Sequence, residues 1–307
     1  MLVFLNPGAS YGRAATRWRA IRDELAERAG GFEVEEIRSA EGTLDSMGRA
    51  IEDGERTFVA AGGDGTVNLV LNTMMELECD VGVTLGAVGL GSSNDFHKPF
   101  GSGSSVAGVP VRLDCERAKP CDVIRVDFDG DDGVRATRFA IINSSLGITA
   151  EANAGFNAPT RLVRAGRSIS VDAAIVASVL HTLATYRDVD CRIVIDGTDE
   201  GSFSVSNLGV IKNPHFAGSF CYDTPIEPDD GLIGVNLCER LTRFQALATL
   251  AALKRRRFRG RPKTRSWIAR RARVEGDRVF ALETDGEVVH ARIAEFSVVP
   301  KRIRCCS

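Results

Sequence analysis

The chain has 307 residues, of which 44% are hydrophobic and 26% charged, with a net charge of −2. These are the proportions of an ordinary globular protein, and the length favours two domains. The apolar runs are shorter than the roughly 18 residues that span a bilayer, and the residues after Met1 lack the pattern of a signal peptide. We therefore expect a cytoplasmic protein.

Cysteine usage and charge placement narrow the possibilities further. The eight cysteines form no Cys-x-x-Cys pair, and the four histidines lack metal-ligand spacing, so we expect reduced thiols with mainly structural roles. Residues 250–275 hold eleven Lys or Arg and one acid. A basic stretch on an otherwise acidic chain favours contact with an anionic surface, such as a membrane or a nucleic acid.

The first hundred residues alternate apolar runs with helical patterns. Strands are predicted at residues 1–5, 32–37, 57–61 and 81–88, and helices at 16–29, 44–52 and 66–77. This βαβαβαβ order predicts an α/β domain with a parallel sheet and helices on both faces. Ligands of such sheets bind at the carboxyl ends of the strands.

After residue 120 the pattern changes to short alternating runs separated by turns. Strands are predicted at residues 122–128, 138–143, 191–195, 201–207, 232–237, 272–274, 279–283 and 293–299. Helices are predicted at 168–186 and 242–258, and a flexible loop at 101–108. We therefore expect two domains, residues 1–119 and a mainly antiparallel β domain from residue 120.

Three glycine-bearing stretches, residues 6–12, 62–65 and 89–94, follow three of the predicted parallel strands. They should meet at one edge of the sheet, where backbone N–H groups can hold the phosphates of a nucleotide. A phosphate would repel Asp64 in the second loop unless Mg²⁺ lay between them. Asp64 therefore predicts a metal, to which Asp95 can contribute, and helix capping by Asp64 is the alternative.

An acidic turn, Glu283-Thr284-Asp285-Gly286-Glu287, lies between two predicted strands near the C-terminus. One interpretation is a type I′ hairpin. The other is that Glu287 or Asp285 reaches across the cleft between the domains as the general base for a substrate hydroxyl. The spacing leaves both interpretations open.

With these motifs in order, the chain resembles the diacylglycerol kinase catalytic-domain family, the bacterial soluble lipid kinases related to sphingosine and ceramide kinases. The resemblance rests on residues 6–7, 62–68, 91–96, 143–148, 230–232 and 285–287. It implies a β-sandwich-like second domain spanning residues 120–296, a segment from about residue 297 that returns to the first domain, and ATP in the cleft. It also implies transfer of the γ-phosphate to a lipid hydroxyl, first that of diacylglycerol, giving phosphatidic acid.

The resemblance also implies roles for individual residues. Glu287 would be the catalytic base, and Asp64 and Asp95 would support Mg²⁺. A second, structural Mg²⁺ would bind the Asp230 carboxylate and the carbonyls of Glu227 and Leu232. The residues expected to bind ATP are Asn6, Pro7, Gly8, Ala9, Ser10, Ser39, Gly62, Gly63, Asp64, Gly65, Thr66, Val67, Asn68, Leu69, Ser92 and Asn94.

Several positions depart from the family pattern. Leu69 stands where a Glu is usual, Gly89 where a Pro is usual, and the glycine-rich segment of the second domain is altered at residues 207–209 and 215–219. Two alternatives stay open: an NAD kinase-like enzyme, because it shares the Gly-Gly-Asp-Gly-Thr loop, and a catalytically weak nucleotide-binding regulatory protein, which Leu69 and the altered glycines favour.

The expected partners follow from the same patterns. A lipid substrate is expected, and the basic residues 254–273 favour transient contact with an anionic membrane. No recognised DNA or RNA motif is present, so we expect no nucleic-acid partner. The oligomeric state stays open, a homodimer included.

Overall fold

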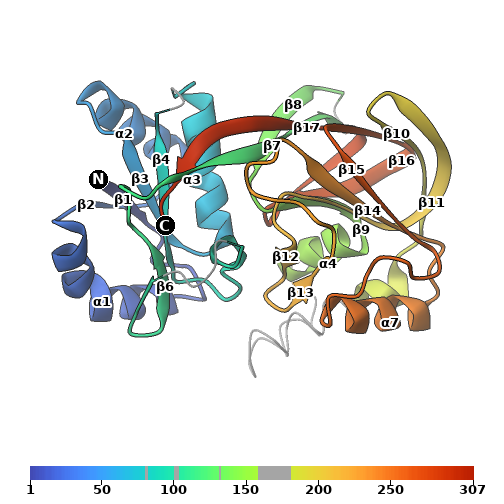
Figure 1. Cartoon of the computed structure of the whole chain (residues 1–307), viewed down its shortest axis with the longest axis horizontal. Helices are drawn as coiled ribbons and strands as arrows, with labels where there is room; N and C mark the ends of the chain where they lie inside the picture. The colour runs from blue at the N-terminus through green and yellow to red at the C-terminus, as the bar shows by residue number, and fades with distance from the viewer. Residues whose placement is uncertain (80–81, 100–103, 131–132, 158–180) are drawn as a thin grey trace.

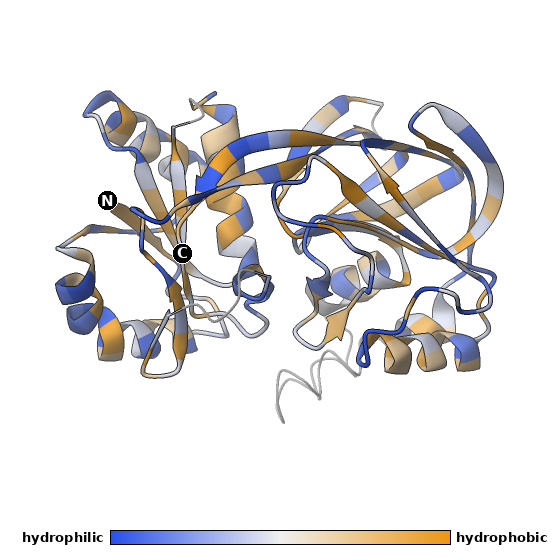
Figure 2. Ribbon diagram, viewed as in Figure 1, coloured by the Kyte–Doolittle hydropathy of each residue, from blue (hydrophilic) through white to orange (hydrophobic). Residues whose placement is uncertain are grey.

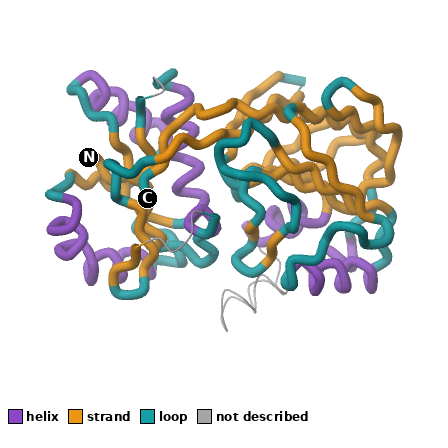
Figure 3. Tube along the Cα trace, in the orientation of Figure 1, coloured by secondary structure: helices purple, strands orange, loops and turns teal. Residues whose placement is uncertain are grey.

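Helices and strands are unevenly distributed along this chain. The computed structural model describes residues 1–79, 82–99, 104–130, 133–157 and 181–307. Figure 3 shows most of the helices in the N-terminal half and most of the strands in the second half. Figure 1 shows these halves side by side, linked by the long strands β7 and β17.

The N-terminal half contains the alternating elements that the sequence predicts, with ends that differ by a few residues. They are β1 (Leu2–Leu5), α1 (Arg13–Ala29), β2 (Glu33–Glu36), α2 (Ala40–Glu52), β3 (Thr57–Gly62), α3 (Asp64–Glu76) and β4 (Thr84–Gly89). The strands pair in parallel in the order β2-β1-β3-β4. Helix α2 begins four residues earlier than expected because the Ser39 hydroxyl accepts the Gly42 N–H at 3.0 Å and caps it.

Alternate residues of strand β1 pack against opposite layers of helices. Val3 belongs to a buried cluster with Trp18 of α1. Phe4 belongs to a different cluster, with Met47 of α2 and Leu71 of α3. Because successive side chains of a strand point to opposite faces, helices cover both faces of this part of the sheet.

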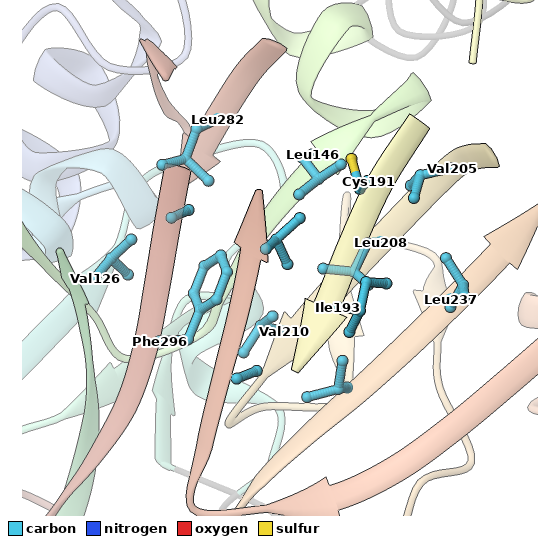
Figure 4. Packing of buried hydrophobic residues seen from close by; sticks show 14 of the residues in the cluster. Val126, Leu146, Cys191, Ile193, Val205, Leu208, Val210, Leu237, Leu282 and Phe296 are labelled. Atoms are coloured by element: carbon cyan, nitrogen blue, oxygen red, sulfur yellow. The ribbon is translucent and has the colours of Figure 1, made fainter. Parts of the chain in front are cut away.

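The second half is built mainly from antiparallel strands. The 3₁₀ turn η1 (Asp95–His97) and strands β5 (Ser104–Val106) and β6 (Val109–Arg112) still belong to the N-terminal half, where β6 pairs with β4. The second half contains β7 (Lys119–Gly130), β8 (Arg135–Ala140), β9 (Asn143–Gly147), α4 (Ile148–Asn157), β10 (Val189–Ile195), β11 (Thr198–Ile211), β12 (His215–Phe216), β13 (Phe220–Cys221), β14 (Ile233–Glu239), α7 (Arg243–Leu253), β15 (Thr264–Ala269), β16 (Arg271–Thr284) and β17 (Glu287–Cys305). Figure 4 shows side chains from several of these strands converging on one core, with Val126, Leu146, Ile193, Leu208, Leu237 and Phe296 among them.

Several expectations for the second half need correction. The strands expected at 272–274 and 279–283 are one strand, β16, whose pairing with β17 is irregular between Glu275 and Phe280. Strands β9, β12, β13 and β15 and helix α4 were not predicted. β15 lies within the basic stretch, where Arg265 and Lys263 mask the alternation of an exposed strand.

Three of the remaining expectations concern residues that lie at least partly outside the described ranges. The predicted helix 168–186 lies largely outside the described residues, and its described part is helical at residues 181–185. Of the loop expected at 101–108, residues 101–103 lie outside the described residues, while Ser104–Val106 form β5, which pairs with β6. Residue 81, the expected start of the fourth strand, is also outside them.

Strand β17 connects the two halves. It pairs with β16 and β7 in the second half, and its last residues, Arg304 and Cys305, pair in parallel with Thr84 and Leu85 of β4. The C-terminus therefore lies in the N-terminal half (Figure 1). The register of β7 and β17 shifts between Val299 and Ile303 as the strands pass from one half to the other. The boundary expected at residue 119 falls at the start of β7 and stays a prediction.

Candidate active site

A cavity of about 400 Å³ lies between the two halves, a volume within the usual range for small-molecule sites. The loops after β1, β3 and β4 supply one side of it, and the β16–β17 turn supplies acids on another. Helix α4, the β12–β13 hairpin and α7 supply an apolar side. The residues that carry the argument below are Ser10, Asp64, Asp95, Ile148, Phe216, Phe220, Leu250, Glu283, Asp285 and Glu287.

The three glycine-bearing loops contact one another at the carboxyl edge of the parallel strands. The Asn6 amide donates to the Thr66 hydroxyl at 3.2 Å, and the Ser10 hydroxyl donates to the Leu90 carbonyl at 2.9 Å. The backbone N–H of Leu90 donates to the Gly62 carbonyl at 2.7 Å. These bonds hold the loops together before any ligand binds.

Glycine is required where the second and third loops touch. A Cβ atom added to Gly91 would lie 2.4 Å from the Gly63 Cα, and one added to Gly62 would lie 2.2 Å from the Thr66 hydroxyl oxygen. At Gly63 and Gly91 the two loops therefore pack backbone against backbone, whereas Gly62 leaves room for the Thr66 side chain of its own loop.

Asp64 lies at the first turn of α3 and lines the cavity. Its Oδ1 accepts the Phe96 N–H at 3.0 Å, which joins the second loop to η1. Burial raises the pKa of the Asp64 carboxyl to about 6, and the nearby charge of Asp95 adds to the rise. The carboxylate is thus short of positive charge, and a cation bound here would offset it.

Asp95 lies beside Asp64, as expected, but its carboxylate already has partners. It forms an ion pair with Lys98, and its Oδ2 accepts the Gly218 N–H at 3.1 Å. Its backbone carbonyl accepts from the Asn213 amide at 2.8 Å. Because Gly218 and Asn213 belong to the second half, Asp95 ties the two halves together across the cavity.

Asp285 is one of the two candidates for the general base, and its contacts favour a structural role. Its carboxylate is buried and accepts the N–H groups of Ile141, Ile142 and Asn143 at 2.8–3.0 Å. The Asn68 amide of α3 also donates to it, at 3.3 Å. Burial raises the pKa of Asp285 to about 6. These bonds fix the β16–β17 turn to both halves of the chain.

Glu287 is the other candidate, and its side chain is exposed in the cavity. Its Oε1 lies 3.9 Å from where a Cβ atom of Gly65 would be, so the carboxylate faces the second loop. Asp285 and Gly286 both have positive φ, 46° and 102°, as a type I′ turn requires. The type I′ hairpin is therefore confirmed, and it presents Glu287 to the cavity, while the role of Glu287 as a general base stays a prediction.

Glu283 is a further acid of the cavity wall that the sequence did not assign to the site. It is buried, and its carboxylate accepts the Ser145 hydroxyl at 2.7 Å and the Gly286 N–H at 2.5 Å. Burial raises the pKa of Glu283 to about 7, and the charges of Asp285 and Glu287 add to the rise. The Gly286 contact places Glu283 directly beneath the turn that carries Glu287.

The predicted ATP-binding residues fall into two groups. Ala9, Ser10, Gly63, Asp64, Gly65 and Ser92 line the cavity. The others support its loops or lie away from it. The Thr66 hydroxyl is buried and bonded to Asn6, the Asn94 side chain accepts the Gly91 N–H at 3.0 Å, and Ser39 is exposed and caps α2. Val67 belongs to the core, and Leu69 is half-buried.

The turn expected to hold a structural Mg²⁺ contains a different cation. The Lys212 ammonium lies 2.5 Å from Asp230 Oδ1 and 2.8 Å from the Leu232 carbonyl oxygen, two of the three predicted ligand atoms. Glu227 contributes its N–H, which donates to Asp230 Oδ2 at 2.7 Å. The residues present do not fit a divalent ion beside Lys212, because the positive charges would repel at contact distance. Within the described residues, no three His, Cys, Asp or Glu side chains gather as a metal site.

The sequence carried weak signals for the features that were missed. Lys212 directly follows the apolar run of β11, and a lysine there is buried only if it is paired. The apolar residues Phe216, Phe220 and Leu250 looked like ordinary core positions, and no local pattern connects them. Only the tertiary fold brings them to one cavity.

Solved structures share this two-part architecture. A diacylglycerol kinase from Bacillus anthracis strain Sterne superposes with a TM-score of 0.68 at 16% identity, covering 99% of this chain and 95% of that one. Yeast NADH kinase in complex with NADH gives a TM-score of 0.50 at 13% identity, covering 100% and 83%. At these identities the likeness shows the fold: an α/β half joined to a β-sandwich-like half.

Family comparisons define the chain further. Residues 1–126 match the diacylglycerol kinase catalytic domain, and residues 145–307 match the YegS C-terminal NAD kinase beta sandwich-like domain. The chain therefore belongs to the family in which these two domains follow one another. A relative from Stenotrophomonas maltophilia strain K279a, named "Probable lipid kinase YegS-like", is 27% identical over 324 residues, or 94% of this chain and 95% of that protein.

Proposed function

We propose that this protein is an ATP- and Mg²⁺-dependent lipid kinase that transfers the γ-phosphate of ATP to a lipid hydroxyl, with diacylglycerol as the first candidate. The observation that carries the proposal is the cavity between the halves, in which Glu287 faces the glycine loop that contains Asp64. Family membership and the names of the relatives support the same activity.

Different residues of the chain would bind ATP, accept the proton of the lipid hydroxyl and position the base. Backbone N–H groups of residues 63–65 and of Ser92, with the Ser10 loop, would hold the phosphates of ATP. Glu287 would accept the proton of the lipid hydroxyl as its oxygen bonds to the γ-phosphorus and the bond to the β-phosphate oxygen breaks, releasing ADP. Glu283 and Asp285 would hold the turn that positions Glu287.

Asp64 is the residue that would hold Mg²⁺, because its carboxylate forms no ion pair with a Lys, Arg or His of the described residues. Asp95 also lines the cavity, but its carboxylate already forms an ion pair with Lys98. When bound with ATP, Mg²⁺ would neutralise phosphate charge that builds up during transfer.

The apolar side of the cavity favours a lipid acceptor. Ile148, Phe216, Phe220 and Leu250 lie across from the glycine loops. A nicotinamide dinucleotide would place a polar ribose or a charged ring against this wall, whereas the hydrocarbon of a lipid would bury apolar surface there. For this reason the NAD kinase-like alternative is less consistent with the site.

The activity can be tested by incubating the protein with labelled ATP and Mg²⁺ against diacylglycerol, other lipid hydroxyls and NAD. We expect label in a lipid and none in NAD, and the Asp64→Ala variant should transfer no label. Exclusive labelling of NAD would replace the lipid assignment. ATP binding without transfer to any acceptor would favour the regulatory alternative.

Helix α7 suggests how the protein reaches its lipid. One of its residues, Leu250, lines the cavity, while Phe244 is 85% exposed and Leu247 is 43% exposed. Ala248 and Ala251 complete an exposed apolar stripe, and the exposed basic residues 254–257 follow directly. Figure 2 shows the helix as mainly hydrophobic with hydrophilic ends.

We propose that α7 contacts an anionic membrane at the mouth of the cavity. Among the described residues no helix is long and apolar enough to cross that membrane.

Membrane contact can be measured by sedimentation with phosphatidylglycerol vesicles. Phe244→Ser should weaken binding roughly tenfold, because most of one aromatic side chain loses its burial in the bilayer. Val279→Ser removes an exposed apolar side chain of β16 as a matched control and should bind like the natural protein. Equal binding by both variants would contradict a role for α7.

A further inference from the structure

A buried lysine lies where the two long connecting strands meet the second half. Lys212 follows β11, and its side chain is 2% exposed. Its ammonium group lies 2.7 Å from Asp122 Oδ2, 2.5 Å from Asp230 Oδ1 and 2.8 Å from the Leu232 carbonyl oxygen. A lysine ammonium has three N–H donors, so each of them has one oxygen partner.

The two carboxylates around this lysine also accept hydrogen bonds from backbone N–H groups. Asp122 is completely buried in β7, and it accepts the N–H groups of Gly231 at 2.7 Å and Lys301 at 2.8 Å. Asp230 accepts the N–H groups of Glu227 at 2.7 Å and Leu232 at 2.9 Å. No oxygen of either carboxylate is left without a donor. We call Asp122, Lys212 and Asp230 the interdomain ion cluster.

The interdomain ion cluster lies where it can stabilise the connection between the two halves. Asp122 lies near the start of β7, and Lys301 lies in β17 with a φ of 49°, inside the register shift between Val299 and Ile303. These are the two strands that run from one half to the other (Figure 1). The cluster therefore fastens β11 and the 227–232 turn to the bend of the connecting strands.

The coordination of the cluster resembles that of a metal ion. Two carboxylate oxygens and one carbonyl oxygen converge on a single positive centre, and these are the hard oxygen ligands that Mg²⁺ and Ca²⁺ prefer. A divalent ion placed here would add charge to a site whose two negative charges are already shared with Lys212 and with four backbone N–H groups. It would also need the volume that the ammonium fills.

We propose that Lys212 is a built-in cation that takes the place of a divalent metal at the junction of the two halves, so that the junction of this protein holds together without metal. Two consequences follow. The stability of the natural chain should not depend on divalent cations at this junction. Removal of the lysine side chain should leave an oxygen-lined space that a divalent cation can enter.

The test compares two substitutions of Lys212 by thermal unfolding without nucleotide. Lys212→Ala opens the space, and Lys212→Met fills it with an uncharged chain of similar length. Both should lower Tm by roughly 6 °C or more, because each leaves the buried Asp122 carboxylate and the partly exposed Asp230 carboxylate without their cation. Millimolar Mg²⁺ or Ca²⁺ should restore much of the loss in Lys212→Ala and little in Lys212→Met. The Asp64→Asn variant, which lacks the carboxylate proposed to hold Mg²⁺ in the cleft, should unfold at the same temperature in EDTA and in Mg²⁺.

Control variants separate this site from the cleft. The rescue of Lys212→Ala should persist when Asp64→Asn is added and disappear when Asp230→Asn is added. If the Lys212→Ala variant fails to fold, Asp230→Asn in the natural background still decides the question. A Mg²⁺-dependent rise in Tm of the natural chain that Asp230→Asn abolishes would overturn the proposal, and so would an unchanged Tm in Lys212→Met. Because stability is measured, a failed kinase assay would not affect the result.

Discussion

The cavity and the interdomain ion cluster both contain buried carboxylates, and their charges are balanced in opposite ways. Burial raises the pKa of Asp64 to about 6 and that of Glu283 to about 7. In the cluster, burial would also raise the pKa of Asp230, but hydrogen bonds from Lys212 and two backbone N–H groups hold it below its ordinary value. The cavity keeps negative charge that a ligand can neutralise, whereas the cluster has its own cation.

This difference shows that the carboxylates expected to bind a ligand and those that stabilise the fold lie in separate regions of the chain. A carboxylate that awaits a cation costs stability in the free protein, because its charged form is poorly solvated. A carboxylate that already has a buried ammonium stabilises the junction but cannot bind another cation. Substitutions in the two regions should therefore have opposite effects on activity and on unfolding.

The largest effect is expected for Glu287→Gln. A positioned general base contributes about 10²–10⁴-fold to the rate, so kcat should fall by that factor. The side chain is exposed and bears none of the bonds that hold the turn, so Tm should stay within about 1 °C of the natural value. Steady-state kinetics and thermal unfolding of the same preparation check both parts. Near-normal turnover would remove Glu287 from the mechanism.

A different result is expected for Asp285, although it is only two residues away. Asp285→Ala leaves the N–H groups of three consecutive residues, 141–143, and the Asn68 amide without their acceptor. The free energy of unfolding should fall by roughly 3 kcal/mol or more. Activity should fall as well, because the turn that carries Glu287 loses its anchor.

Asp285→Asn is the matched control for that loss. It keeps the size of the side chain and one acceptor oxygen, so denaturant unfolding should show a smaller loss of stability than for Asp285→Ala. If Asp285→Ala were as stable as the natural protein but inactive, Asp285 would be the base rather than the anchor.

The sequence was most informative where the chemistry is local. The strand–loop–helix order, the three glycine loops and the pair Asp64 and Asp95 follow from spacing and residue type alone. Edge strand β15 was hidden by its charges, and β9 and α4 by the lack of a clear period. The poor fit of the Asp230 turn to the predicted metal could not be read from the sequence, since Lys212 is eighteen residues away in the chain and reaches the turn only through the pairing of β11 with β14.

The smallest effect, and the most direct comparison of the two regions, is expected from pH. Asp64 has a raised pKa of about 6, so the folded protein takes up a proton there as pH falls from 7 to 5, and that proton competes with Mg²⁺. The apparent affinity for Mg²⁺-ATP should fall by up to about tenfold for each pH unit below 6.

Asp230, whose pKa is lowered, keeps its charge over this range. Its contribution to stability is complete above the ordinary carboxyl pKa of about 4 and is lost only as pH falls through the lower folded value. The effect of Asp64 on stability has the opposite dependence on pH. Because its pKa is raised in the folded state, the folded protein becomes less stable as pH rises from about 4 to 6.

Calorimetric titration of Mg²⁺-ATP and thermal unfolding, both between pH 5 and 8, separate the two carboxylates. Subtracting the pH dependence of binding to Asp64→Asn removes the protonation of the nucleotide itself. If the difference in Mg²⁺-ATP affinity between the natural protein and Asp64→Asn did not vary with pH, Asp64 would hold no cation. A loss of the Lys212-dependent part of Tm already at pH 5 would show that the cluster is not balanced as its geometry indicates.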